Sequence, residues 1–241
     1  MAGFSNEKRR LRVASYNIRK CIGLDRRRNP ARSLDVINQL QADIVALQEA
    51  DRRLGTRPAA LPRHLLETGS DFVPAPVAAH PGSLGWHGNA ILLRRGLAPV
   101  TLHRLALPGL EPRGAVIVDV ILPGTTEPLR VVGVHLGLMR RHRLKQLAWL
   151  RRHLDLLNPA PTVILGDFNE WSRRRGMGPL DDHFTIHAPG RSYHAAHPVG
   201  RLDRIATGPG IRLLASGVLD QGAAQRASDH LPIWADIELD T

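Results

Sequence analysis

The sequence has a single cysteine, Cys21, among its 241 residues. One cysteine cannot form a disulfide within the chain, and it cannot supply the several thiolates of a cysteine-based zinc site. A chain of this length can bury a stable core without such cross-links. We therefore expect a fold that is held together by packing.

Long apolar runs are also missing. No stretch approaches the roughly 18 uninterrupted apolar residues of a membrane-spanning helix. Residues 1–10 are polar and basic, without the apolar segment of a signal peptide. We expect a cytoplasmic protein with no transmembrane segment, in which residues 1–10 form a flexible basic N-terminus.

Several catalytic motifs and most aromatic residues are absent as well. The chain contains no HExxH, no GxSxG and no Walker A loop, which disfavours zincins, α/β-hydrolases and P-loop enzymes. Four Trp, two Tyr and four Phe leave few platforms on which the bases of a single nucleic-acid strand could stack.

Positive charge is abundant. The chain has 33 basic and 22 acidic residues, for a formal net charge of +11. Such an excess favours polyanionic partners, namely nucleic acid, an anionic membrane surface or phosphorylated substrates. The alternative is that the many arginines reflect the codon usage of a GC-rich genome, because net charge bears on association and not on fold.

Short runs rich in Val, Ile and Leu recur along the chain, bounded by Gly, Pro and Asp, as is typical of strands. They span residues 11–17, 43–48, 89–93, 115–122, 129–135, 162–165, 202–206, 211–214 and 232–237. Helical spacing of leucines predicts helices over 31–41 and 140–157. Many strands with few helices indicate an α+β fold of two packed sheets with helices outside, and no clear linker divides residues 1–241 into more than one domain.

Polar side chains stand at the ends of these apolar runs. The inventory combines carboxylates, amides and imidazoles: Asn17, Glu49, His135, Asp167, Asn169, Asp203, Asp229 and His230. Carboxylate and amide oxygens suit Mg²⁺ or Mn²⁺, and imidazoles beside carboxylates suit proton transfer. Taken singly, an Asp or Asn at a strand end is more often a turn former or a helix cap.

At these residues the sequence resembles the endonuclease/exonuclease/phosphatase superfamily of metal-dependent phosphoesterases, and within it the small uncharacterised bacterial members. Eight motifs occur in the family's order: SYNIRK (15–20), ADIVALQE (42–49), HGNAILLR (87–94), PRGAV (112–116), GVHLG (133–137), GDFNEW (166–171), RLDRI (201–205) and SDHLPI (228–233). The resemblance implies a four-layer αββα sandwich, deoxyribonuclease I-like, of two mixed or antiparallel sheets.

The resemblance also implies roles for individual residues. Glu49 matches the main metal-ligating glutamate, Asn17 matches the asparagine beside it, and Asp229 matches the further carboxylate at the metal site. Asp167 and Asn169 match the pair that orients the attacking water, and His135, Asp203 and His230 complete the catalytic set. Arg113 and Asn89 lie in motifs associated with phosphate contact or loop geometry. The arginine runs 26–28 and 173–175 follow two motifs and are candidates for binding substrate phosphate.

The expected activity is hydrolysis of a phosphodiester by in-line attack of an activated water, with Mg²⁺, or Mn²⁺ in its place. Nucleic acid and an anionic phospholipid headgroup are the leading substrate classes, the second implying peripheral membrane contact. A soluble phosphomonoesterase and a non-catalytic phosphate-binding module of the same fold are the alternatives. We expect a monomer.

Overall fold

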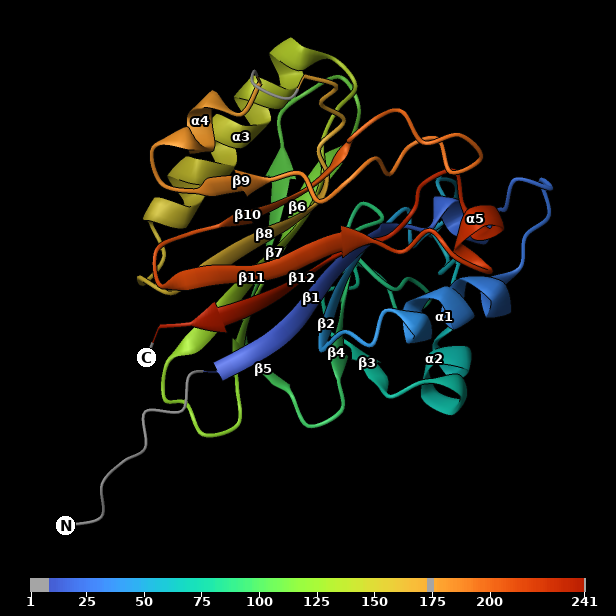
Figure 1. Ribbon diagram of the computed structural model, residues 1–241, viewed down its shortest axis with the longest axis horizontal. Coiled ribbons are helices and arrows are strands. Elements are labelled where there is room, and N and C mark those ends of the chain that lie inside the picture. Colours follow the sequence, from blue (N-terminus) through green and yellow to red (C-terminus); the bar gives the residue numbers. More distant parts are fainter. Residues whose placement is uncertain (1–8, 173–175, 241) are drawn as a thin grey trace.

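The computed structural model describes residues 9–172 and 176–240. They form two six-stranded sheets, with strand orders β11-β12-β1-β2-β4-β3 and β5-β6-β7-β8-β10-β9 (Figure 1). The first sheet contains β1 (Arg9–Asn17), β2 (Ile44–Gln48), β3 (Phe72–Pro74), β4 (Ala90–Arg94), β11 (Ile211–Val218) and β12 (Ile233–Leu239). The second contains β5 (Ala98–Leu107), β6 (Arg113–Ile121), β7 (Pro128–His135), β8 (Thr162–Asp167), β9 (Thr185–His187) and β10 (Asp203–Thr207).

Both sheets are mixed. β1 pairs in parallel with β2 and antiparallel with β12, and β7 pairs in parallel with β8 and antiparallel with β6. The two strands of each parallel pair therefore finish at the same end of their sheet. The polar residues of the sequence motifs lie at or just beyond these strand ends.

Helices cover the outer face of each sheet, which gives four layers (Figure 1). α1 (Pro30–Gln39), α2 (Arg63–Gly69) and α5 (Ala224–Ala227) pack on the first sheet, and α3 (Arg140–Asp155) and α4 (Gly178–Asp181) pack on the second. A third apolar cluster fills the space between the sheets, with Val13, Val131 and Val163 among its members. The expected αββα sandwich is confirmed.

The two long helices follow from local sequence. The Asn29 side chain caps α1 by accepting a hydrogen bond from the Arg32 backbone N at 3.0 Å, and Pro30 occupies the first turn. In α3 the leucines at positions 147, 150 and 154 are buried against the second sheet. Both helices end two residues before the predicted positions, at Gln39 and Asp155.

The sequence pattern did not predict every element correctly. β5 was not predicted, because as an edge strand most of its side chains are exposed and it lacks a buried apolar run. The segment expected to be a flexible N-terminus overlaps β1, where Arg9 and Arg10 pair with Leu239 and Glu238; residues 1–8 lie outside the described residues. In the described parts of the chain, no helix has the length and apolar character needed to cross a membrane.

Candidate active site at the open end of the sandwich

Strand alternation directs the polar side chains into the space between the sheets. In β8, Val163 and Leu165 belong to the intersheet core, so Asp167, the next residue of the same parity, faces the same space. The same alternation orients the last side chains of β1 and β7 and the first side chain of β10. These residues are Asn17, His135 and Asp203.

Pairing register then brings three of these residues side by side. His135 is the parallel partner of Asp167, and Asp203 is its antiparallel partner. A side chain at Gly166 would disturb this edge, since a Cβ there would lie 2.0 Å from the Val134 carbonyl oxygen. Glycine at this position of the GDFNEW motif thus lets β7 and β8 approach each other.

Asp167 is the centre of the polar cluster and is buried. Its Oδ1 accepts a hydrogen bond from the Asn169 backbone N at 2.9 Å, and its Oδ2 accepts one from Asn17 Nδ2 at 3.1 Å. The Nε2 atoms of His135 and His230 lie 3.5 and 3.6 Å from the same Oδ2. One carboxylate therefore joins residues from both sheets.

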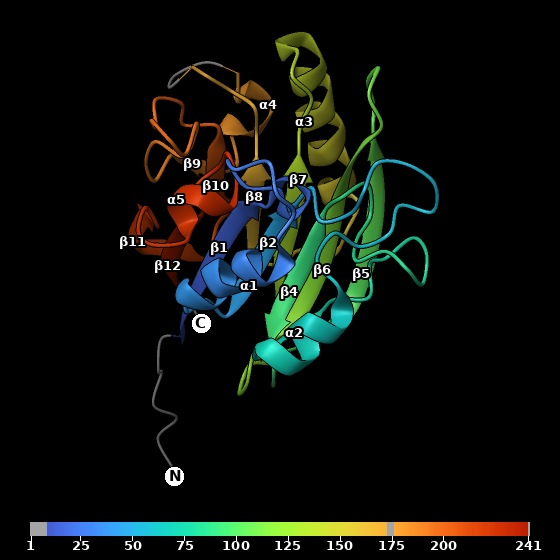
Figure 2. The same ribbon diagram turned by 90° about the vertical axis from the view of Figure 1, so that its right-hand side faces the viewer.

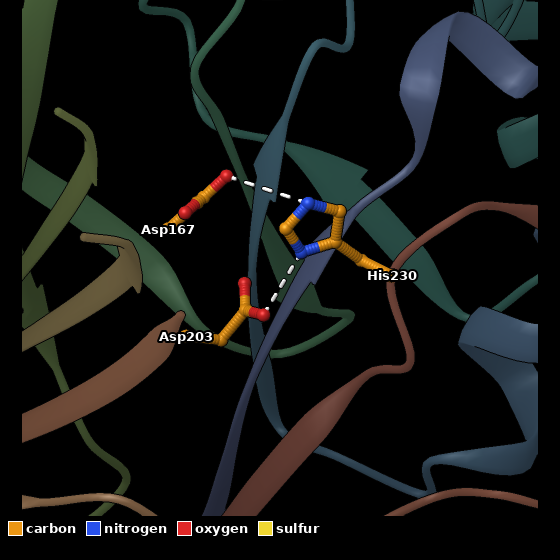
Figure 3. A group of neighbouring side chains, drawn as sticks. All are labelled: Asp167, Asp203 and His230. Atoms are coloured by element: carbon orange, nitrogen blue, oxygen red, sulfur yellow. Dashed lines mark hydrogen bonds and ion pairs between the residues drawn. The ribbon is translucent and has the colours of Figure 1, made fainter. Parts of the chain in front are cut away.

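His230 lies between two carboxylates (Figure 3). Its Nδ1 is 2.9 Å from Asp203 Oδ2, and its Nε2 faces Asp167. Asp203 is itself held by the Ser192 hydroxyl, which donates to Oδ2 at 2.5 Å. The ring of His230 is thus fixed in orientation by a buried partner on the side away from Asp167.

These surroundings shift the pKa values of the buried groups. Burial raises the pKa of Asp167 to about 6, while the facing His230 opposes that rise. Burial alone would lower the pKa of His230, but Asp203 and Asp167 outweigh it and raise the value to about 9. Burial and Arg113 lower the pKa of His135 well below 6.5. At neutral pH, His230 is a cation and His135 is neutral.

Asp167, Asp203 and His230 offer ligand atoms within 4.8 Å of one another, a grouping that could hold a metal ion. The same arrangement, an imidazole between two carboxylates, also suits proton transfer.

A second polar group lies at the end of the first sheet. The backbone N atoms of Ile18 and Lys20 donate to the Gln48 and Glu49 carbonyls, both at 3.1 Å, so the short 3-10 turn η1 (Arg19–Cys21) lies beside the end of β2. The Lys20 ammonium forms an ion pair with the Glu49 carboxylate. Burial, assisted by Arg53, lowers the pKa of Lys20 to about 8.

Asp229 and Asn17 complete this second group. Arg19 Nε lies 3.3 Å from Asp229 Oδ2, so both carboxylates of the group face a cation from η1. The Asn17 amide is oriented from both sides, because its nitrogen donates to Asp167 and its oxygen accepts from the Arg19 backbone N at 3.1 Å.

The cleft has two lobes that share one wall. The catalytic lobe, of about 290 Å³, is lined by Asn17, Glu49, Arg53, Glu111, Arg113, His135, Leu138, Asp167, Asn169, Trp171, Tyr193, Leu202, Asp229 and His230. The basic lobe, also about 290 Å³, is lined by Lys20, Glu49, Asp51, Arg52, Arg53, Arg57, His87, Gly88, Glu111, Pro112, Arg113 and His135. Cationic side chains outnumber carboxylates in the basic lobe, so an anionic group is favoured there.

Eight of the ten site residues predicted from the sequence line the catalytic lobe. The ninth, Asp203, lies behind His230 and contacts it directly. Asn89 is different: it is fully buried, donates to the Gly114 carbonyl at 2.9 Å and lines neither lobe. Of the two roles considered for Asn89, its placement fits loop geometry and not phosphate contact.

Arg113 is buried and lines both lobes. Its Nη2 donates to Glu111 Oε2 at 2.8 Å, while Nε finds no hydrogen-bond partner among the described residues. Burial lowers the pKa of this guanidinium. A largely buried cation that lines the cleft is suited to a substrate phosphate.

Several cleft residues were not identified from the sequence. Arg53, Arg57 and His87 come from two loops that the strand pattern treated as connections. Ser192 supports Asp203 from a third loop. A positive φ marks strained backbone at five positions around the cleft: Lys20, Glu49, Arg57, His87 and Asn169. The residue types at these positions did not predict the strain.

The two arginine runs named as candidates for binding phosphate have different outcomes. Run 26–28 is exposed, and Arg28 donates a hydrogen bond to the Lys20 carbonyl of η1. Run 173–175 lies outside the described residues.

Known proteins share this architecture. A curated relative, the uncharacterised protein YbhP of Escherichia coli K12, is 32% identical over 222 residues, covering 85% of this chain and 87% of YbhP. The mannosyl-6-phosphatase Bt3783 of Bacteroides thetaiotaomicron superposes with a TM-score of 0.74 at 16% identity, covering 94% of this chain and 99% of that one. Zebrafish (D. rerio) TDP2, complexed with a single-strand DNA product, superposes with a TM-score of 0.69 at 17% identity, covering 95% and 98%.

The two structural likenesses show a shared fold. The family model described as endonuclease/exonuclease/phosphatase family matches residues 14–230, a span that contains all ten predicted site residues. Together with the polar cluster at the end of the two sheets, this match confirms the resemblance that the sequence motifs suggested. The chain belongs to the endonuclease/exonuclease/phosphatase family.

Proposed function

We propose that the protein hydrolyses phosphodiesters with the help of a divalent cation. The cation is Mg²⁺, and Mn²⁺ can replace it. The observation that carries the proposal is the cluster around Asp167, a buried carboxylate that faces an open cleft. It is contacted by an amide from the other sheet and faced by one neutral and one charged imidazole.

The residues of the second polar group fit a hard divalent cation. Glu49, Asp229 and the Asn17 oxygen are carboxylate and amide donors on the wall of one lobe, and such oxygens are what Mg²⁺ prefers. Each carboxylate faces a cationic side chain from η1, which a bound divalent cation would have to replace as its partner. A cation held by these residues supplies charge neutralisation for the phosphate and its leaving oxygen.

The chain's own residues would perform the remaining steps. Asp167, with its raised pKa, lies where it can orient a water and accept its proton. His230, held as a cation by Asp203, donates a charged hydrogen bond to oxygens that gain charge in the transition state. Arg113 adds a second fixed positive charge on the opposite wall.

The proposed substrate is a polyanion, either nucleic acid or an anionic phospholipid headgroup. The net charge of +11 and the basic lobe support this class, because both raise the local concentration of anions. Relatives of the same fold include a protein named as a mannosyl-6-phosphatase, so a soluble phosphomonoester is a second candidate. A phosphate-binding module without catalysis is the alternative from another class.

Turnover of bis(4-nitrophenyl) phosphate and nicking of supercoiled plasmid test the proposal. We expect the wild type to hydrolyse the small diester with Mg²⁺ or Mn²⁺ and to be silent in EDTA. Asp167→Asn and Glu49→Ala should each lower kcat by about a hundredfold or more, with the fold intact.

Each alternative gives a different result. Hydrolysis of 4-nitrophenyl phosphate but not of the diester would replace the proposal with a phosphomonoesterase. Phosphate binding by a folded protein that turns over neither compound would leave a binding module. Turnover that is unchanged in both variants would remove Asp167 and Glu49 from the reaction.

A further inference from the structure

Exposed apolar side chains gather around the mouth of the cleft. Within residues 9–172 and 176–240, twelve large apolar side chains are exposed, and half of them lie on five loops at this end of the sandwich. We call these six the apolar rim: Leu54, Leu110, Leu138, Met139, Trp171 and Val199. Single exposed apolar side chains are common on protein surfaces, whereas a group of them at one opening is typical of an interaction surface.

Topology places the five loops around one opening. They follow β2, β7 and β8, or precede β6 and β10, at the strand ends that carry the polar cluster. Leu138 and Trp171 line the catalytic lobe themselves, and Leu54 and Leu110 are next to the lining residues Arg53 and Glu111. Figure 2 shows the β5–β6 connection and one end of α3 projecting at the same end of the molecule.

Position around the cleft, and not the degree of exposure, distinguishes the rim from the rest of the surface. Leu54 is 85% exposed, Leu110 81% and Leu138 65%. Leu156 follows α3, and the other exposed apolar side chains of the described residues are spread over α3 and the edge strands β3, β5 and β11. Scattered single residues of that kind need no explanation, whereas a ring around a catalytic cleft does.

Arginines accompany the apolar rim. Arg52 and Arg53 are exposed beside Leu54, and Arg140 and Arg141 are exposed directly after Met139. Glu111 is an exposed carboxylate in these loops, and it is paired with Arg113. The rim thus combines mainly aliphatic tips with an excess of exposed positive charge, which is the composition of a surface that binds an anionic bilayer.

We propose that the apolar rim docks the cleft on an anionic lipid bilayer and that the phosphate ester of a lipid headgroup is the substrate. The substrate assignment rests on the proposed function above; the docking does not. A nucleic-acid strand would use the arginines and could stack a base on Trp171, but it would gain little from the five aliphatic side chains of the rim, because bases stack on aromatic rings. Leucine tips inserted between acyl chains, with arginines at the headgroups, use both features.

Vesicle sedimentation tests the docking apart from catalysis. The probe is a vesicle of about one-third phosphatidylglycerol and two-thirds phosphatidylcholine, with pure phosphatidylcholine for comparison. The Asp167→Asn protein is used in EDTA so that no lipid is consumed. We expect it to sediment with the anionic vesicles and to bind pure phosphatidylcholine far more weakly.

A double substitution identifies the docking face. In the same background, Leu54→Ser with Leu110→Ser should weaken binding by about tenfold or more, since two inserted leucines are lost. Leu156→Ser, which removes an equally exposed leucine after the other end of α3, should leave binding unchanged. With Asp167 restored, the double variant should keep wild-type turnover of the water-soluble diester and lose turnover of vesicle lipid.

Other results would each reject the docking, the lipid substrate or the proposed reaction. No sedimentation by the folded protein, or equal loss in the double variant and Leu156→Ser, overturns the docking. Binding and cleavage of single-stranded DNA without vesicle binding would make the cleft a nucleic-acid site. Vesicle binding through the rim by a protein that hydrolyses neither soluble diester nor lipid would uphold the docking and remove the proposed reaction.

Discussion

Two histidines face Asp167, and their surroundings give them opposite protonation states. His135 lies against Arg113 and His230, so burial is reinforced by positive neighbours and its pKa falls. His230 lies between two carboxylates, so its pKa rises. A neutral and a charged imidazole on one carboxylate give the site a fixed asymmetry, with distinct places for a proton donor and a charge stabiliser.

The first prediction concerns the titration of His230 in the metal-free protein. Its folded-state pKa of about 9 exceeds the unfolded value of about 6.5, so its stabilisation is full below pH 6.5 and is lost as the pH rises through 9. Long-range ¹H–¹⁵N NMR of the imidazoles in EDTA measures this pKa directly. Urea unfolding at pH 6 and pH 9.5 measures the loss of stability.

Asp203→Asn supplies the comparison for this titration. Removing the carboxylate that contacts Nδ1 should lower the pKa of His230 toward its ordinary value, while His135 stays neutral at pH 7. A His230 that titrates at or below 6.5 in the unsubstituted protein would show that burial outweighs the two carboxylates.

At the scale of elements, a buried ion pair joins the catalytic loop to α3. Glu170 follows Asn169 in the GDFNEW motif, and its Oε2 accepts from Arg143 Nη2 at 2.7 Å. Its Oε1 accepts from the Ser172 backbone N at 2.8 Å. Arg143 also donates to the Leu138 carbonyl at 2.5 Å, so one guanidinium fixes the loops after β7 and β8.

The second prediction is that Glu170→Ala destabilises the protein and displaces the catalytic loop. Leaving Arg143 buried without its partner should lower the free energy of unfolding by about 3 kcal/mol. Asp155→Ala breaks the exposed Arg151–Asp155 pair of the same helix and should cost less than about 0.5 kcal/mol. Urea denaturation of both variants gives the comparison, and equal losses would contradict a special role for the buried pair.

The connection from β2 to α2 forms a fixed wall of the basic lobe. The Asp51 carboxylate accepts from the backbone N atoms of Leu84 and Gly85 at 2.6 and 3.1 Å. Ala59 N donates to the Gly82 carbonyl and Ala60 N to that of Ala50, both at 2.8 Å. These bonds hold the β2–α2 connection near both of its ends, as expected of a fixed wall.

At the scale of the whole molecule, metal binding should stabilise the fold. A cation that binds only the native state adds about 2.7 kcal/mol at a hundredfold excess over its Kd, which raises the Tm of a chain this size by about 5 to 10 °C. Our third prediction is that Mg²⁺ gives such a rise in calorimetry and that Glu49→Gln removes it. Glu67→Gln, an exposed change in α2, should keep the full shift.

The fourth prediction follows from the net charge of +11. Salt screens the attraction between the protein and a polyanionic substrate, so KM for such a substrate should rise several-fold from low salt to about 0.3 M NaCl. For bis(4-nitrophenyl) phosphate, which carries one charge, KM should change little over the same range. Equal salt dependence for the two would mean that the arginines do not attract the substrate.

The sequence alone determined the family, the layered fold and most of the polar cluster. Motifs such as GDFNEW and SDHLPI are local, and the resemblance that they carry is what implied roles for residues such as Asp167 and His230. For residues within strands, such as Asp167, the alternation of side chains then predicts which face of the sheet they occupy. The edge strand β5 was not predicted, because most of its side chains are exposed and its sequence therefore lacks the apolar run of a buried strand.

Only the tertiary structure decided what lies around that cluster. The basic lobe, the Lys20–Glu49 pair, the support of Asp203 by Ser192 and the apolar rim all join loops that are far apart in the chain. The burial of Asn89 likewise appears only when β4 packs beside β6. Loop conformation depends on contacts between distant segments, and no local pattern of residue types encodes those contacts.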